Sequence, residues 1–193
     1  MLKTKRKAEY KINKLILNRW SPRSMTGEQL SDKELMSLFE AAKWAPSSYN
    51  NQPWRFIYAK RNSEYWNKFL DLLVEGNKVW AQNAAVLIVL ISRKKFEHNE
   101  SPSVTHSLDT GAAWQNLALE ASSKNLVAHG MEGFDYEKAK EVLKISDNFQ
   151  VEAMIAVGKL DKKSKLSEAY KKMELPSERK PLKNIIMEGS FKE

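Results

Sequence analysis

The chain has 193 residues, 42% of them hydrophobic and 10% aromatic, which is typical of one folded domain and not of a disordered chain. It has no cysteine, which excludes disulfides, thiolate metal sites and cysteine nucleophiles, and its three widely spaced histidines do not indicate a zinc site. The net charge of +8 lies at the two ends: residues 1–14 have six Lys/Arg against one acid, and residues 159–183 have nine against four. The longest apolar run, residues 84–91, is too short to cross a bilayer. We therefore expect a soluble cytoplasmic protein with solvated basic termini, and neither membrane nor nucleic acid as a partner.

Hydrophobic periodicity predicts interspersed helices and strands. The second helix has the clearest start, a capping box formed by Ser31 and Glu34. Because helices and strands do not alternate strictly, the predicted class is α+β, with a central mixed or antiparallel sheet flanked by helices. The helices are expected at about residues 4–18, 32–45, 64–75, 107–126 and 136–145, and the strands at 54–59, 84–91 and 149–157.

The C-terminal part of the chain is expected to differ from the rest. Residues 159–181 are basic and contain two prolines, which indicates an extended arm, and the apolar segment 185–187 that follows is strand-like. We divide the chain into a core, residues 1–158, and an arm, residues 159–193, within a single domain.

Three segments are candidates for a binding site, although each also has an ordinary explanation. Residues 19–23 place two arginines and a serine around a proline, an arrangement that can hold a phosphate but that also fits a plain basic loop. Residues 44–54 join a helix to a strand through many amide and hydroxyl side chains, which can bind a heteroaromatic ring or simply form a turn. Residues 130–135 place two glycines before a helix, where a capped turn is the simpler interpretation. Classical phosphate-loop, dinucleotide and nucleophile-elbow motifs are absent, and no spacing singles out a catalytic acid or base.

Taken together and in this order, the three segments resemble the FMN-dependent nitroreductase family. The family has an Arg-x-Ser-x-Arg cluster, here residues 19–23, and a W-A-P-S-x-x-N-x-Q-P-W-R-F segment, here residues 44–56. An alanine-rich central helix follows, here with the sequence D-T-G-A-A-W-Q-N-L at 109–117, and then a turn ending in G-F-D at 133–135. The resemblance covers roughly residues 12–183. It implies a homodimer whose C-terminal arms are exchanged and which binds FMN at its interface.

The resemblance also implies roles for individual residues. Arg19, Ser21 and Arg23 would bind the FMN phosphate and ribityl chain, with Arg179 as a further phosphate ligand. Trp20 stands among them where a second basic residue is common. Other residues would contact the flavin ring, the first four from the partner subunit: Pro46, Ser47, Ser48, Asn50, Asn77, Glu132 and Gly133.

The function implied is that of an oxidoreductase in which the flavin itself carries out the chemistry and no side chain is catalytic. NAD(P)H would reduce the flavin in a ping-pong cycle, and a nitroaromatic, a quinone or a related small electrophile would then take the electrons. Tyr49, Trp80 and Trp114 are candidate stacking surfaces for such a substrate. Three alternatives stay open: a family member that binds flavin with little turnover, one with another reaction such as dehalogenation, ene reduction or flavin breakdown, and, more remotely, a basic protein that binds nucleic acid.

Overall fold

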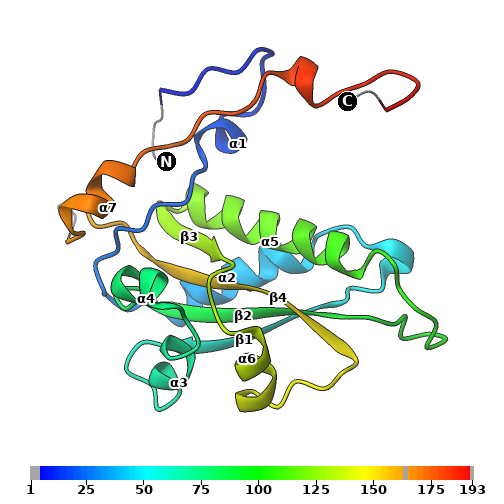
Figure 1. Cartoon of the computed structure of the whole chain (residues 1–193), viewed down its shortest axis with the longest axis horizontal. Helices are drawn as coiled ribbons and strands as arrows, with labels where there is room; N and C mark the ends of the chain where they lie inside the picture. Colours follow the sequence, from blue (N-terminus) through cyan, green and yellow to red (C-terminus); the bar gives the residue numbers. More distant parts are fainter. Residues whose placement is uncertain (1–4, 163–164, 192–193) are drawn as a thin grey trace.

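The fold is built on one antiparallel sheet with the strand order β1-β2-β4-β3. In the computed structural model, which describes residues 5–162 and 165–191, helices cover both faces of this sheet (Figure 1). The predicted α+β class is confirmed, and the sheet is purely antiparallel. The strands are β1 (Trp54–Lys60), β2 (Val86–Arg93), β3 (Leu126–Met131) and β4 (Phe149–Lys159).

The central strand β2 is buried on both faces because its apolar residues alternate between two cores. Leu87, Val89 and Ile91 face one hydrophobic cluster. The residues between them, such as Ile88 and Leu90, face the other. The prediction of a doubly buried strand here is confirmed, and β2 anchors the layers on either side of it.

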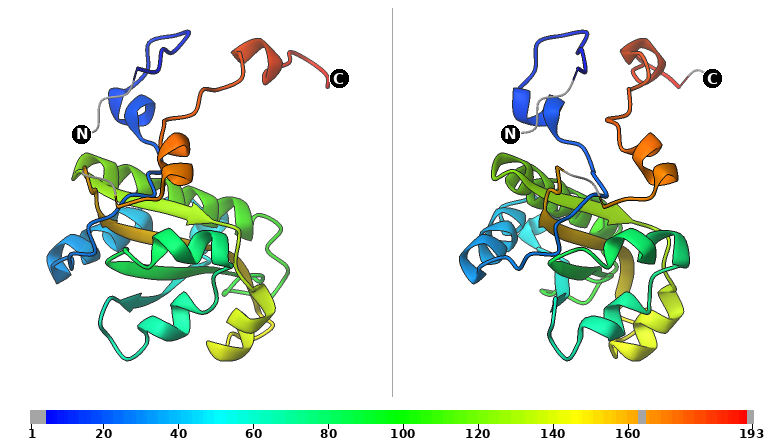
Figure 2. Two further views of the ribbon diagram at one scale, coloured as in Figure 1. Left: turned by 60° about the vertical axis from the view of Figure 1, so that its left-hand side comes forward. Right: turned by 90° about the vertical axis from the view of Figure 1, so that its left-hand side faces the viewer.

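The helices form a layer on each face of the sheet (Figure 2). On one face the long helix α5 packs with α2, whose start is fixed by the expected capping box, since the Ser31 side chain accepts from the Glu34 amide. Three short helices cover the opposite face. The bounds are α2 (Asp32–Lys43), α3 (Trp66–Leu70), α4 (Glu75–Ala81), α5 (His106–Ser123) and α6 (Tyr136–Val142).

The core differs from the prediction at two places. The helix predicted at residues 64–75 ends at Leu70, and a second helix begins at Glu75, because residues 72–74 leave the helical path to bond with a distant segment: Val74 N donates to Gly133 O, and Leu72 O accepts from Asp135 N. Strand β3 was not predicted at all. The preceding helix ends three residues earlier than expected, at Ser123, and Asn125 turns the chain with a positive φ of 59°.

The terminal segments also differ from expectation, and both project from the core (Figures 1 and 2). The predicted first helix is reduced to α1 (Lys14–Asn18); residues 5–13 are not helical, and the predicted start at residue 4 lies outside the described residues. A helix there would have no core to pack against, and short isolated helices are unstable in water. The arm contains a short helix, α7 (Glu168–Met173), and residues 185–187 follow a 3-10 turn (Leu182–Asn184) without forming a strand.

Within the described ranges, no helix is long and apolar enough to cross a membrane, and no group of histidine and acidic side chains could hold a metal ion.

Candidate functional site

Residues 19–23, which we call the motif segment, run from α1 toward the core as extended chain. Arg19 Nη1 donates to Ser21 Oγ at 3.2 Å, so two of the side chains predicted to bind the FMN phosphate and ribityl chain lie together. The Arg19 guanidinium is half-buried; this burial, and the nearby charges of Arg179 and Arg6, lower its pKa from the ordinary value. An arginine stays charged at neutral pH, so the motif segment carries a partly desolvated positive charge that favours an anion.

The C-terminal arm is held against the motif segment by one carboxylate. Glu174 accepts hydrogen bonds from the backbone amides of Arg23 and Ser24, each at 2.8 Å. This contact brings the arm alongside the motif segment from about 150 residues away in sequence, and it places Arg179 close enough to Arg19 to affect its pKa. Three of the predicted phosphate ligands, Arg19, Ser21 and Arg179, therefore gather in one region.

Helix α4 and the end of β3 form the neighbouring wall. Gly133 O accepts from Asn77 Nδ2 at 3.0 Å and from Val74 N at 3.1 Å. A Cβ on Gly133 would lie 2.7 Å from Asn77 Nδ2, so a larger residue here would displace the Asn77 side chain. Asn77 and Gly133, both predicted to contact a flavin, are thus direct neighbours, and exposed Glu132 lies between the end of β3 and Gly133.

His129 on β3 connects this wall to the motif segment. Its Nδ1 lies 2.9 Å from Pro22 O, and because a carbonyl oxygen only accepts, Nδ1 carries the proton. The imidazole also packs on the Trp80 indole, with ring centroids 4.6 Å apart. Trp80 is 1% exposed, so it belongs to the core and cannot offer a stacking surface to a substrate, which corrects that prediction.

The pKa of His129 makes the stability of the fold sensitive to acid. Burial lowers this pKa below the ordinary value of about 6.5, and the charges of Arg23 and Arg19 act in the same direction, partly opposed by hydrogen bonds to the Pro22 and Ser21 backbone. The unfolded chain therefore binds a proton more readily than the folded chain. The contribution of neutral His129 is complete above about pH 6.5 and is lost as the pH falls toward the lowered folded value.

This linkage is testable by urea unfolding between about pH 5 and pH 8. We expect the free energy of unfolding of the wild type to decrease more steeply below pH 6.5 than that of His129→Asn. The carboxylates titrate in both proteins, so the difference between the two pH profiles isolates His129. Parallel pH profiles of the two proteins would show that His129 does not cause the loss of stability in acid.

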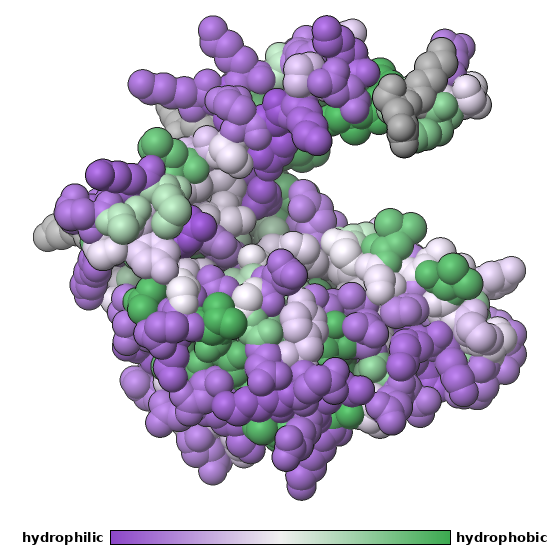
Figure 3. All heavy atoms as spheres, in the orientation of Figure 1, coloured by the Kyte–Doolittle hydropathy of each residue, from purple (hydrophilic) through white to green (hydrophobic). Residues whose placement is uncertain are grey.

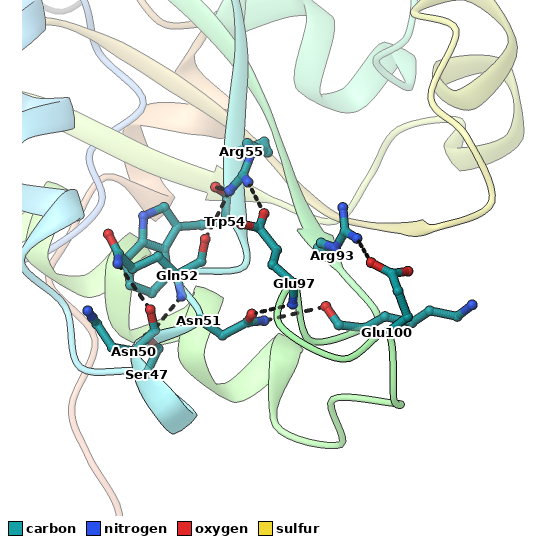
Figure 4. A network of polar contacts seen from close by, with 10 residues as sticks. Ser47, Asn50, Asn51, Gln52, Trp54, Arg55, Arg93, Glu97 and Glu100 are labelled. Atoms are coloured by element: carbon teal, nitrogen blue, oxygen red, sulfur yellow. Dashed lines mark hydrogen bonds and ion pairs between the residues drawn. The ribbon is translucent and has the colours of Figure 1, made fainter.

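The loop between α2 and β1 is preorganised by its own polar contacts (Figure 4). Ser47 Oγ accepts from Gln52 N at 3.0 Å, which closes the loop on itself. Tyr49, Asn50 and Gln52 all have φ near +50°, a region that non-glycine residues seldom adopt and that is concentrated at functional sites. The loop carries Pro46 and Asn50 exposed.

Two neighbouring elements hold this loop in place. The Asp109 carboxylate, buried in the first turn of α5, accepts from Ser48 N at 3.0 Å. From the other side, Asn51 Oδ1 accepts from Glu97 N at 3.0 Å, and the Glu97 carboxylate pairs with Arg55 (Figure 4). A cavity of about 330 Å³ lies between the loop and residues 97–98, and Tyr49, 82% exposed, lines it.

Within one chain, the loop and the motif segment do not meet. Ser48 is bonded at the start of α5, whereas the motif segment lies near the other end of that helix (Figure 1). The predicted site is therefore divided into two groups. Arg19, Ser21, Arg23, Asn77, Gly133 and Arg179 lie on one side, and Pro46, Ser47, Ser48 and Asn50 lie on the other.

Comparison with known proteins identifies the family to which this arrangement belongs. The model of the nitroreductase family matches residues 16–159. The chain belongs to the nitroreductase family. A family relative from Archaeoglobus fulgidus, whose name couples NADH dehydrogenase with NAD(P)H nitroreductase, is 28% identical over 149 residues, or 75% of this chain and 83% of that protein.

Solved nitroreductase-family structures agree with this membership. A crystal structure described as an oxidoreductase containing FMN is 44% identical, has a TM-score of 0.93 and covers 100% of this chain and 98% of its own. A nitroreductase from Desulfovibrio desulfuricans, solved in complex with FMN, is 28% identical with a TM-score of 0.69, and the match covers 92% of this chain and 96% of that one.

Sequence reasoning missed several residues that shape this nitroreductase-family site. Asp109 had a weak signal, as an acidic residue in the first turn of a nearly uncharged helix. His129 stood out only as one of three histidines. Glu174 and Arg6 gave no signal, because their partners lie far away in sequence: Arg6 Nη1 donates to Arg19 O at 2.9 Å.

Proposed function

We propose that this chain is an FMN-dependent NAD(P)H oxidoreductase that reduces nitroaromatics, quinones or related electrophiles. The observation that carries the proposal is the grouping of Arg19 and Arg179 beside the motif segment. Among the described residues, the arginine ion pairs are those of Arg55 and Arg93, so neither guanidinium of this group has a carboxylate partner. Forked guanidinium groups bind phosphate through pairs of charge-assisted hydrogen bonds, and the FMN named in two solved relatives has a phosphate.

The remaining predicted residues fit the same ligand. Arg19, Ser21, Arg23 and Arg179 would hold the phosphate and ribityl chain, with Trp20 beside them. Asn77, Glu132 and Gly133 would face the flavin ring from the wall of α4 and β3, which His129 ties to the motif segment. When bound, FMN supplies hydride transfer between NAD(P)H and an electrophile, while the protein orients it and sets its electrostatic surroundings.

The second group of predicted residues would come from another copy of the chain. The loop that carries Pro46, Ser47, Ser48 and Asn50 is too far from the motif segment to act within one chain, so we propose a homodimer that brings the two together. The projecting termini leave a deep notch above the core (Figure 3). The arm carries apolar side chains that a lone chain leaves in water: Leu175, Ile185, Ile186, Met187 and Phe191.

A homodimer would bury these side chains, and burying one large apolar side chain contributes about 1.5–3 kcal/mol. We therefore expect light scattering to give twice the mass of one 22.2-kDa chain at micromolar concentration. A monomer over this range would contradict the dimer and would leave the second group of residues without a role at the flavin.

An absorption spectrum before and after anaerobic addition of NADH and NADPH tests the proposed function most directly. Visible flavin bands that bleach would support a reductase and would identify its preferred donor. Flavin bands that persist would favour a binding protein with little turnover or one with another donor. A colourless protein that takes up no added FMN would overturn the proposal, and its basic termini would then be tested against nucleic acid.

A further inference from the structure

The two basic termini enclose a cavity of about 340 Å³ above the motif segment. One side is formed by residues 6–10, Ile12 and Leu17, and the other by residues 178–180, Leu182 and Ile185. A hydrogen bond joins the two sides, since Leu182 N donates to Glu9 Oε1 at 2.8 Å. The N-terminal segment is thus attached to the arm that carries Arg179, although neither segment lies within the part of the chain that matches the family model, residues 16–159.

Arg6 enters this region with an unsatisfied donor. Its Nη1 donates to Arg19 O at 2.9 Å, which brings the guanidinium group to the motif segment. Its Nε is buried and has no hydrogen-bond partner. A buried donor without an acceptor destabilises a fold, more so when it belongs to a charged group, so the arrangement lacks an acceptor at this point.

The charges around Arg6 indicate what kind of acceptor is missing. Burial and the charge of Arg179 lower the pKa of Arg6, and the opposing effect of Glu178 is the smallest of the three. Arg6 and Arg179 in turn lower the pKa of Arg19. Three guanidinium groups that repel one another are stabilised together by a multivalent anion, whose several oxygens can accept from all of them.

We propose that Arg6 is an additional ligand of the FMN phosphate, acting with Arg19 and Arg179, so that the N-terminal segment closes over the cofactor. This inference rests on the proposed function, and it assigns to residues 5–13 a role that the family match does not include. It also accounts for one unexpected feature of the fold. Residues 5–13 are not helical and run beside the arm, and this path brings Arg6 back to the motif segment. The occupant expected at Arg6 is the phosphate and not the ring, because only the phosphate supplies a multiply charged acceptor.

The test compares FMN with riboflavin, which has the same ring and ribityl chain but no phosphate. Dissociation constants for both are measured by quenching of flavin fluorescence in the wild type, Arg6→Ala and Lys11→Ala. Lys11 is the matched control, because it lies in the same segment, is exposed and does not line the cavity. Arg19→Ala serves as the positive control for loss of a phosphate ligand.

We expect Arg6→Ala to weaken FMN binding by about ten- to a hundredfold, the range of a lost hydrogen bond to a charged group, and to change riboflavin binding less than about twofold. Lys11→Ala should leave both constants unchanged. The wild type should also lose FMN affinity more steeply with added salt than Arg6→Ala does, because one fewer charge contacts the phosphate in the variant.

Other outcomes would overturn the inference. Unchanged FMN binding in Arg6→Ala would remove Arg6 from the site, and an equal loss of FMN and riboflavin would make it a structural residue. If Arg6→Ala does not fold, Arg6→Gln, which keeps most of the side chain without the charge, is measured in its place. A wild type that binds neither flavin would overturn the proposed function itself, whereas a wild type that binds both equally would overturn only the role of the phosphate.

Discussion

Replacing Trp80 by alanine is expected to lower the free energy of unfolding by about 3–5 kcal/mol, the usual cost of removing a large buried aromatic side chain. Trp80 is among the largest fully buried side chains, and it lies between the core on one side of the sheet and the imidazole of His129. Alanine at position 80 would leave a cavity between the core and the His129 imidazole. Urea unfolding of the two proteins measures the difference.

Two controls separate the cavity from other effects. Trp80→Phe keeps most of the ring and also removes the indole Nε1, which is buried without a partner, so its cost should be well below that of alanine. Trp44→Ala removes a tryptophan that is 74% exposed and should change stability by no more than about 0.5 kcal/mol. Equal losses in Trp80→Ala and Trp44→Ala would contradict the prediction.

The Trp80→Ala substitution should also affect the proposed cofactor site. His129 is held between Trp80 and the carbonyl of Pro22, so loss of the indole frees the imidazole and, through it, the motif segment. We expect Trp80→Ala to weaken FMN binding even at temperatures where the variant is fully folded. Trp80→Phe, which still supports the imidazole, should bind FMN much as the wild type does.

Elements with a strong local pattern were predictable from the sequence. The apolar run of β2 was most simply explained as a strand buried on both faces, and the serine and glutamate of the capping box indicated the start of α2. In both elements, the residues that determine the structure are close together in the sequence.

Elements determined by distant partners were not predictable in the same way. The break between α3 and α4 depends on backbone hydrogen bonds from residues 72–74 to residues 133–135, and no local pattern indicates these partners. Strand β3 is short, and His129 and Gly130 interrupt its apolar run, so its position depends on pairing with β4. The predicted first helix failed for the opposite reason, because its apolar residues have the right spacing but no core to pack against.

The candidate site also contains features that a local pattern reveals and features that depend on distant partners. The motif segment and the loop after α2 could be found because their unusual residues are consecutive. The contacts that assemble the site connect residues far apart in sequence, such as Ser48 with Asp109 and Arg23 with Glu174. Sequence reasoning could therefore propose which residues bind a cofactor, but not which residues hold them in place.

Glu174 is the clearest residue that holds others in place, and Glu174→Ala is expected to loosen the arm where it passes the motif segment. Its carboxylate accepts from the amides of Arg23 and Ser24, and a hydrogen bond to a charged group contributes about 1.5–3 kcal/mol. Without it the two amides of the motif segment lose their acceptor, and Arg179 is no longer held beside Arg19. We expect faster hydrogen exchange at residues 165–180 and at 19–24, together with weaker FMN binding.

Glu168→Ala is the matched control, because Glu168 lies on the same arm but, among the described residues, its carboxylate pairs with Lys171, one turn away on α7. It should leave both hydrogen exchange and FMN affinity close to those of the wild type. If Glu174→Ala also leaves them unchanged, the arm is positioned by other contacts. If exchange rises while FMN affinity is retained, the arm is released but Arg179 does not contribute to binding, and the phosphate would then be held by the motif segment and Arg6 alone. The two measurements together therefore distinguish an arm that shapes the site from an arm that merely lies beside it.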